Sequence, residues 1–246
     1  MSHLLLRSRA LLLAAAVCAS APVASAKPLG EGGVALSART DVPVLVGLSA
    51  AVEGPHRLRG QLSLGVMPGP YVDLTNAALT EYEVYSENVA TIIDAALRRS
   101  LVTRVEGGWR PLPERGLVVL GGYQLLALGG DTAELSAFGE AMDGRLLSSA
   151  QDVTGDIEVG VSAHQLTAGA GWEWSPAPRL HLGANLGFAG TVATRSMART
   201  TREARNAVGQ TLSDDVTTGV ASYLDYVFDE WVHLPMIGVS VGWRLK

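Results

Sequence analysis

Apolar and polar residues alternate along many short stretches of the chain. From Val42 to Val52 the even positions are apolar, whereas Gly47, Ser49 and Glu53 hold odd positions. Successive side chains of a β-strand point to opposite faces, so this period of two predicts strands with one apolar and one polar face. Eight stretches follow the pattern: 33–40, 42–53, 57–67, 101–110, 116–127, 158–174, 179–192 and 231–245.

One of these stretches departs from its own alternation. Within 158–174 the apolar parity changes near His164 and Gln165. A change of parity inside a strand indicates an extra residue. The sequence therefore predicts a β-bulge at this point, or a strand that begins there.

The connections between the eight stretches alternate in length. Gly54–His56, Pro111–Arg115 and Ser175–Pro178 are short and contain proline, whereas 68–100, 128–157 and 193–230 are long. Bacterial outer-membrane barrels combine short periplasmic turns, long extracellular loops and an even number of strands. The pattern predicts an all-β fold, an eight-stranded antiparallel up-and-down barrel. Alternation alone also fits a soluble barrel of the lipocalin type.

Tryptophan placement favours the transmembrane barrel over the soluble one. Trp109, Trp172, Trp174 and Trp243 lie on the apolar faces of their strands, each within a few residues of a short turn or of the C-terminus. Aromatic side chains gather in belts at membrane interfaces. We therefore expect one aromatic girdle at the periplasmic interface.

The first residues of the chain resemble an export signal. Arg7 and Arg9 precede an apolar run from Ala10 to Ala21, and the small residues Ala24-Ser25-Ala26 follow. This order is typical of a secretory signal peptide, and the run is too short to span a bilayer. We expect a signal peptide at 1–26 and a barrel at 27–246, with Cys18, the only cysteine of the chain, in the removed part.

Composition narrows the function classes. Hydrophobic residues make up 48% of the chain, charged residues 17%, and the formal net charge is −5. Disordered chains are less apolar than this, and nucleic-acid-binding domains carry an excess of basic residues. The sequence therefore predicts a folded protein with no nucleic-acid partner.

Three short segments add a resemblance to a known class. Met67–Asp73, Gly108–Pro111 and Gly121–Tyr123 resemble segments of the small eight-stranded outer-membrane barrel proteins of Gram-negative bacteria, the OmpA/OmpX-like class. The resemblance covers essentially the whole of 27–246. It implies an outer-membrane location, contact with outer-membrane lipid and lipopolysaccharide, and insertion by the barrel-assembly machinery. These proteins end in an aromatic residue, whereas this chain ends in Lys246.

If the apolar faces meet lipid, the polar faces must fill the interior. An eight-stranded barrel is only wide enough for its own side chains, and buried charges need partners, so these residues predict a packed ionic lumen. The alternative is a narrow polar pore in which Arg59, Arg104 and Glu106 control passage. The predicted lumen residues are Glu53, Arg57, Arg59, Gln61, Arg104, Glu106, Arg110, Glu173, Arg179, His181, Asn185 and Arg244.

The long connections contain apolar residues at helical spacing. Ser86 is a suitable N-cap for a helix over 87–99, a second helix follows Ser213, and Ala133–Met142 is a weaker third candidate. The apolar faces carry Val89, Ile92, Ile93 and Leu97 on the first helix and Val216, Val220 and Leu224 on the second. We expect the helices to pack on one another as a cap over the barrel. A cap that binds an envelope or extracellular protein, or a stripe that lies in the outer leaflet, are the alternatives.

Signals for catalysis are weak. His164 with Ser162 or Thr167 is the only pair that could imitate a lipid-modifying barrel enzyme, and the acidic residues of 131–156 lack calcium-loop spacing. The sequence predicts no metal site and no cofactor. We expect a structural or interaction protein of the cell envelope and not an enzyme, with a narrow solute channel as the alternative and a lipid-modifying enzyme as the less favoured one.

Overall fold

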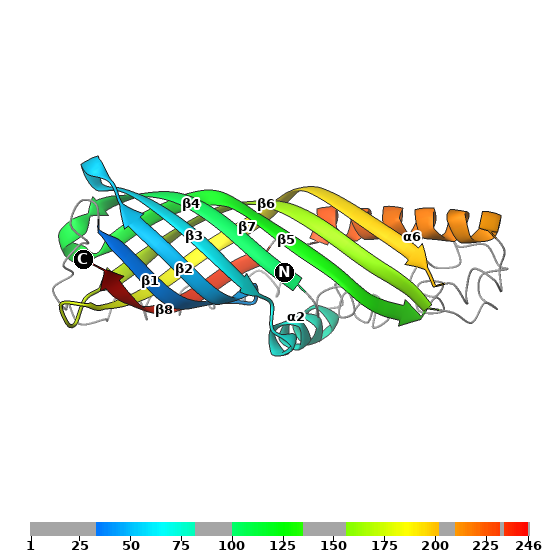
Figure 1. The fold of residues 1–246 in the computed structure, drawn as a ribbon, viewed down its shortest axis with the longest axis horizontal. Coiled ribbons are helices and arrows are strands. Elements are labelled where there is room, and N and C mark those ends of the chain that lie inside the picture. The colour runs from blue at the N-terminus through cyan, green and yellow to red at the C-terminus, as the bar shows by residue number, and fades with distance from the viewer. Residues whose placement is uncertain (1–32, 82–99, 135–155, 202–209, 232–233, 246) are drawn as a thin grey trace, which may run out of the picture.

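The strands of this chain close into one barrel (Figure 1). The computed structural model describes residues 33–81, 100–134, 156–201, 210–231 and 234–245. Each strand pairs antiparallel with the next, and β1 pairs with β8, as the sequence predicts. The strands are β1 (Val34–Val42), β2 (Leu45–Glu53), β3 (Leu58–Val66), β4 (Ser100–Leu112), β5 (Leu117–Glu134), β6 (Asp156–Trp174), β7 (Leu180–Thr200) and β8 (Leu234–Leu245).

One end of the barrel carries tight turns, and we call it the short-turn end. The 3-10 turns Pro55–Arg57 and Pro113–Arg115 lie there, as does the link 175–179 between β6 and β7. Gly116 closes the second turn with a φ of 72°, a left-handed conformation that favours glycine. The other end carries the predicted long connections, and it also carries one tight turn between β1 and β2, where Val44 N donates to Asp41 O at 2.6 Å.

Three strands continue beyond the barrel at the long-connection end. The β5–β6 ladder runs as far as Glu134 opposite Asp156, and the β6–β7 ladder as far as Ile157 opposite Thr200. Their neighbours stop earlier, because β4 begins at Ser100 and β8 pairs with β7 only up to Ala189. Figure 1 shows the resulting three-stranded extension, which we call the arm (129–134, 156–163 and 193–200). The sequence analysis predicted loops over 128–157 and 193–230, so the expected strand ends at 127 and 192 were wrong.

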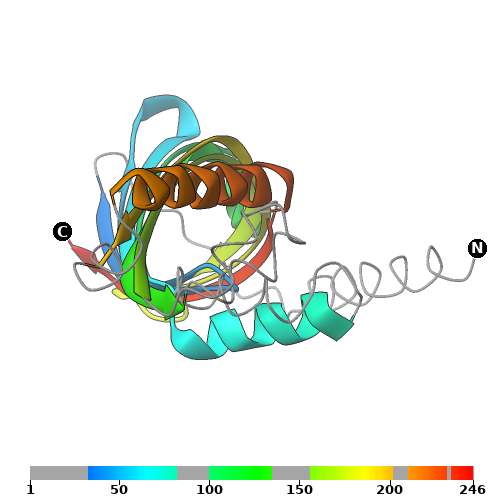
Figure 2. The same cartoon turned by 90° about the vertical axis from the view of Figure 1, so that its right-hand side faces the viewer.

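Two described helices lie at the long-connection end. α2 (Gly69–Glu81) follows β3, and α6 (Gln210–Trp231) lies between β7 and β8. Figure 2 looks into this end and shows α6 along one side of the barrel and α2 outside the ring of strands on the opposite side. The helix predicted over 87–99, with Val89, Ile92, Ile93 and Leu97, lies outside the described residues, as does most of Ala133–Met142. Ala133 itself belongs to β5.

The wall of the barrel is apolar outside and polar inside. Leu48, Leu62, Val105 and Val241 point outward and are at least half exposed, whereas Arg104 and other charged residues are buried within. In a soluble protein apolar side chains are buried and charged side chains are exposed. A closed sheet with an apolar exterior meets the demands of a bilayer, because every backbone hydrogen bond inside the hydrocarbon is made. No described helix has the length and apolar character to cross a membrane.

The tryptophans lie at the short-turn end of this apolar wall. Trp109 and Trp243 are about half exposed on the outer face, at 49% and 52%. Trp109 pairs with Leu58 beside the first turn, Trp172 pairs with Leu117 beside the second, and Trp243 pairs with Leu36. Trp172 and Trp174 are only partly exposed.

Candidate functional site

The interior nearest the short-turn end is filled by a first group of charged residues. Arg59 donates to Glu53 at 3.4 Å and to Glu173 at 2.5 Å. Arg110 donates to the same two carboxylates, with its Nε 2.8 Å from Glu53 Oε1. His181 Nε2 lies 3.5 Å from Glu173 Oε1. The arrangement joins five strands, so we call it the lower ionic layer.

A second group, the upper ionic layer, lies above the first. Arg104 Nη1 donates to Asp41 at 2.6 Å, and Arg39 Nε lies 2.7 Å from the same carboxylate. Arg39 also donates to Glu106 at 3.3 Å. Neutral amides complete the layer. Gln124 accepts from Arg104 at 2.6 Å and donates to Gln165 at 2.7 Å. Gln61 donates to Glu106 at 3.5 Å, and Asn185 donates to Asp41 at 3.1 Å.

Glycines on the inner face make room for these long side chains. A Cβ at Gly238 would overlap Asp41 Oδ1 and lie 2.6 Å from Asn185 Oδ1. Because β8 presents no side chain at this position, Asp41 and Asn185 can meet in front of it. The polar network therefore depends on small residues as well as on charged ones.

Two of the predicted lumen residues lie elsewhere. Arg57 belongs to the 3-10 turn and is exposed, and Arg179 is exposed in the link before β7. The prediction was wrong for both because it extended strand alternation into turns, where alternate residues do not share a face. The structure places Glu53, Arg59, Gln61, Arg104, Glu106, Arg110 and His181 inside and buried, and Glu173, Asn185 and Arg244 inside and partly buried.

The sequence analysis missed four residues of the upper ionic layer, Arg39, Asp41, Gln124 and Gln165. Arg39 and Asp41 alternate with Ser37 on β1, and this parity could have revealed Arg39; Asp41 lay beyond the predicted strand end at residue 40. Gln124 and Gln165 gave weaker signals, because apolar Leu120 and Leu126 share the strand face of Gln124 and Gln165 lies at the parity change.

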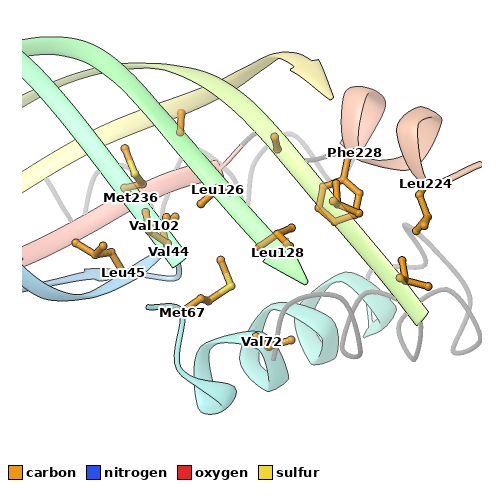
Figure 3. Packing of buried hydrophobic residues seen from close by; sticks show 14 of the residues in the cluster. Val44, Leu45, Met67, Val72, Val102, Leu126, Leu128, Leu224, Phe228 and Met236 are labelled. Atoms are coloured by element: carbon orange, nitrogen blue, oxygen red, sulfur yellow. The ribbon is translucent and has the colours of Figure 1, made fainter. Parts of the chain in front are cut away.

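Above the ionic layers the interior becomes apolar. Val102, Leu126, Leu128 and Met236 are buried against Leu45 in the barrel mouth, and Figure 3 shows these side chains converging there. We call this part of the cluster the apolar plug. The first turn of α2 contributes Val72, and Tyr71 reaches β1 by a 2.5 Å hydrogen bond between its hydroxyl and that of Thr40. The plug was not predicted, because the lumen was expected to be ionic throughout.

The plug also explains the parity change in β6. Odd positions point inward along the described strand, with Ile157, Val159 and Val161 buried at one end and Gln165 and Thr167 at the other. The inward face therefore changes from apolar to polar, while Leu166 and Trp172 on the outward face meet the membrane side. The expected bulge is present, but its extra residue is Val192 of β7, opposite His164 and Gln165. The alternative, a strand that begins there, was wrong.

Little empty space remains inside. Two small cavities lie among the described lumen side chains, with volumes of ≈ 20 Å³ and ≈ 10 Å³. A cavity needs roughly 10–15 Å³ to hold one water molecule. Each of these cavities therefore has room for about one water.

α6 covers the inner side of the arm. Val220, Leu224 and Phe228 are buried at spacings of four residues and belong to one cluster with Ile157 and Val159 of β6. Thr194 of β7 donates to Asp225 O at 3.3 Å. Partial burial raises the pKa of the nearby Tyr223 phenol. The side chain of Val216 lies outside the described residues. Val220 and Leu224 are buried as predicted, and Phe228, one turn further on, was missed.

The histidine considered for lipid chemistry has a different partner. His164 Nδ1 is hydrogen bonded to the hydroxyl of Tyr123, on the outer face of β5 and β6. Thr167 points into the barrel and is buried, so it cannot act with His164 on the outer face. Ser162 shares the outer face of β6 with His164. Among the described residues no cluster of three His, Cys, Asp or Glu could hold a metal ion.

The apolar exterior, the ionic interior and the closed antiparallel sheet together define an eight-stranded transmembrane β-barrel. The N-terminal β-barrel domain of Pseudomonas aeruginosa OprF is similar in structure, with a TM-score of 0.41 and 11% identity over 87% of this chain and 98% of that one. Acinetobacter baumannii CarO2 has a TM-score of 0.37 and 11% identity over 87% and 98%, and CarO of the same species has 0.34 and 10% over 89% and 98%. No protein-family model and no curated protein sequence matches the chain.

Proposed function

We propose that this chain is a closed outer-membrane barrel that anchors the arm and α6 at the cell surface, as a structural or interaction protein of the envelope. The observation that carries the proposal is the filled interior. Two ionic layers and the apolar plug leave cavities of only ≈ 20 Å³ and ≈ 10 Å³ among the described residues. A barrel built to conduct would keep a continuous aqueous path, as large porins do.

Several features support the location. The signal-like residues 1–26 and a membrane-spanning sheet are the combination expected of an exported barrel. The tight turns and both described chain ends lie together at the short-turn end, which corresponds to the periplasmic side of such barrels. The arm and α6 then lie outside the cell, in contact with the lipopolysaccharide layer.

The arm gives the proposal its interaction surface. α6 buries its apolar face against β6 and β7, so the arm and α6 form one packed unit. The outward face of the arm carries the exposed side chains of Arg195, Met197 and Arg199. A mixed polar and apolar surface suits contact with an envelope or extracellular protein.

The orientation is tested with an epitope inserted next to Gly209, between β7 and α6. We expect antibody binding on intact cells, with a second epitope next to Glu114 in the short-turn end as the matched control that stays hidden until the outer membrane is permeabilised. The reverse pattern would contradict the surface location of the arm.

The closed state is tested by liposome swelling. Vesicles that contain the folded protein should swell in small sugars no faster than protein-free vesicles, with a known porin as the positive control. Swelling that grows with the amount of barrel would contradict the anchor and support the narrow solute channel.

A further inference from the structure

A groove lies at the long-connection end of the barrel wall, lined by the end of β3 and the residues after it, the start of β4, and β5. The β3–β4 ladder ends at Gly65 opposite Val102, and β5 continues past both strands. The groove has a volume of ≈ 670 Å³ and is widely open. Small-ligand sites in proteins span about 300–1,000 Å³, so the groove is large enough for a ligand.

The groove joins two apolar regions of the molecule. Val66 and Leu101 line its outer side, are 50% and 49% exposed, and continue the apolar band of the outer wall. Met67 and Leu128 line its inner side; both belong to the buried cluster, and Leu128 is part of the apolar plug. A hydrophobic group that entered from the outer wall would meet these two apolar side chains at the inner side of the groove.

The lining residues also exclude a charged ligand. None of the described residues around the groove carries a charge, and the hydroxyl of Ser100 already accepts a 2.9 Å hydrogen bond from Met67 N. A polar ligand would lose its water without gaining partners. The groove therefore fits an apolar occupant.

The height of the groove places it at the edge of the hydrocarbon layer. Leu101 precedes the girdle residue Trp109 by eight positions along β4, about 26 Å of strand at ~3.3 Å per residue. With a strand tilt of about 35–45° this is roughly 20 Å of height, close to the ~25 Å apolar band of such barrels. The outer side of the groove thus opens where acyl chains meet the head groups.

We propose that this groove binds one acyl chain of a lipid from the adjoining leaflet. The chain leaves the lipid-facing surface between Val66 and Leu101 and ends against Met67 and Leu128. Val66 and Leu101 belong both to the lipid-facing surface and to the groove, so lipid is the occupant that borders it. The inference is independent of whether the lumen conducts.

Two glycines allow a matched test. A Cβ at Gly129, which lines the groove, meets no described atom within 4 Å, and the same is true at Gly107 on the lipid-facing wall of β4. Neither residue has a positive φ. Gly129→Phe therefore fills the groove, and Gly107→Phe adds the same side chain to the membrane surface away from it.

The experiment uses vesicles that contain a phospholipid with a photoreactive diazirine near the end of one acyl chain. In the wild type we expect labelling concentrated on peptides with Met67 and Leu128, where the end of the chain lies, saturating at one lipid per barrel. Gly129→Phe should lower this labelling about tenfold, which corresponds to about 1.4 kcal/mol of binding free energy. Gly107→Phe should leave it unchanged, and heat-modifiable migration checks that both variants fold.

Three results would overturn the proposal: labelling spread evenly over the outer wall, groove labelling that Gly129→Phe does not reduce, or labelling of residues 82–99 in place of the groove. The last result would mean that this connecting segment occupies it. If Gly129→Phe does not fold, Gly69→Phe enters the groove from its other side, where a Cβ also meets no described atom within 4 Å, and the same outcomes apply.

Discussion

Arg104 is the most deeply buried cation of the described lumen. It is 0% exposed, and its guanidinium bonds Asp41 at 2.6 Å, Gln124 at 2.6 Å and the sulfur of Met236 at 3.1 Å. Taking a charge out of water costs several kcal/mol unless its partners are well placed. Arg104 therefore ties β1, β4, β5 and β8 to one arrangement.

Asp41 is the acceptor on which this layer depends, because Arg39, Arg104 and Asn185 all approach it. Asp41→Asn keeps the shape but removes the charge, and it should lower the free energy of unfolding by about 3–5 kcal/mol, the cost of breaking a buried pair. Urea titration of the barrel in vesicles measures the change. Asp214→Asn, at an exposed position of α6, is the control and should change little. A loss below about 1 kcal/mol for Asp41→Asn would mean that water reaches the layer.

At the residue scale the sequence predicted most charged lumen residues inside regular strands but not their partners. Alternation places Arg104 and Glu106 on the same face of β4. In the structure Arg104 donates to Asp41, whereas Glu106 accepts from Arg39. Pairing across the lumen depends on the register of strands far apart in the sequence, which a period of two does not contain.

At the scale of elements, α6 and the arm form one packed unit. Leu224 and Phe228 of α6 are buried with Ile157 of β6, whereas Tyr226 on the same helix is 59% exposed. A buried side chain of this size contributes roughly 1.5–3 kcal/mol. The helix is therefore held by a few side chains and can detach without loss of the barrel.

Leu224→Asp should release α6 while the strands stay paired. Protease added to the folded variant in detergent should cut within 210–231 and leave the barrel intact, because the closed hydrogen-bonded sheet does not depend on the helix. Tyr226→Asp is the matched control and should be cut no faster than the wild type. Equal cleavage of Leu224→Asp and the wild type would show that this contact does not hold the helix.

The sequence predicted the elements inside the membrane better than those outside it. Lipid on one side and the lumen on the other impose strict alternation, so the strand cores were placed correctly. In the arm, the inward face of β6 packs on α6 and the outward face meets water. The apolar residues therefore lie on the inward face before His164 and on the outward face after it. α2 was missed because the helix in this connection was predicted from the apolar stripe of 87–99, further along the chain.

At the scale of the whole molecule, the outer wall should show a dependence on membrane depth. Leu62 and Leu58 of β3 are 51% and 52% exposed, but Leu58 pairs with Trp109 at the girdle and Leu62 lies further up the wall. Leu62→Arg should cost about 2–4 kcal/mol of unfolding free energy and Leu58→Arg only about 0–1, measured by reversible unfolding in vesicles. Equal and small costs would mean that the wall faces water.

The central claim is that the described interior is closed, and single-channel recording in a planar bilayer tests it most directly. The cavities among the side chains of the ionic layers have volumes of ≈ 20 Å³ and ≈ 10 Å³, each room for about one water molecule. Folded wild-type protein, with insertion verified by protease protection and a porin recorded in parallel, should give no steady unitary current at any voltage that the bilayer withstands. Reproducible current steps of one size, present in the wild type and scaling with the amount of inserted barrel, would contradict the account.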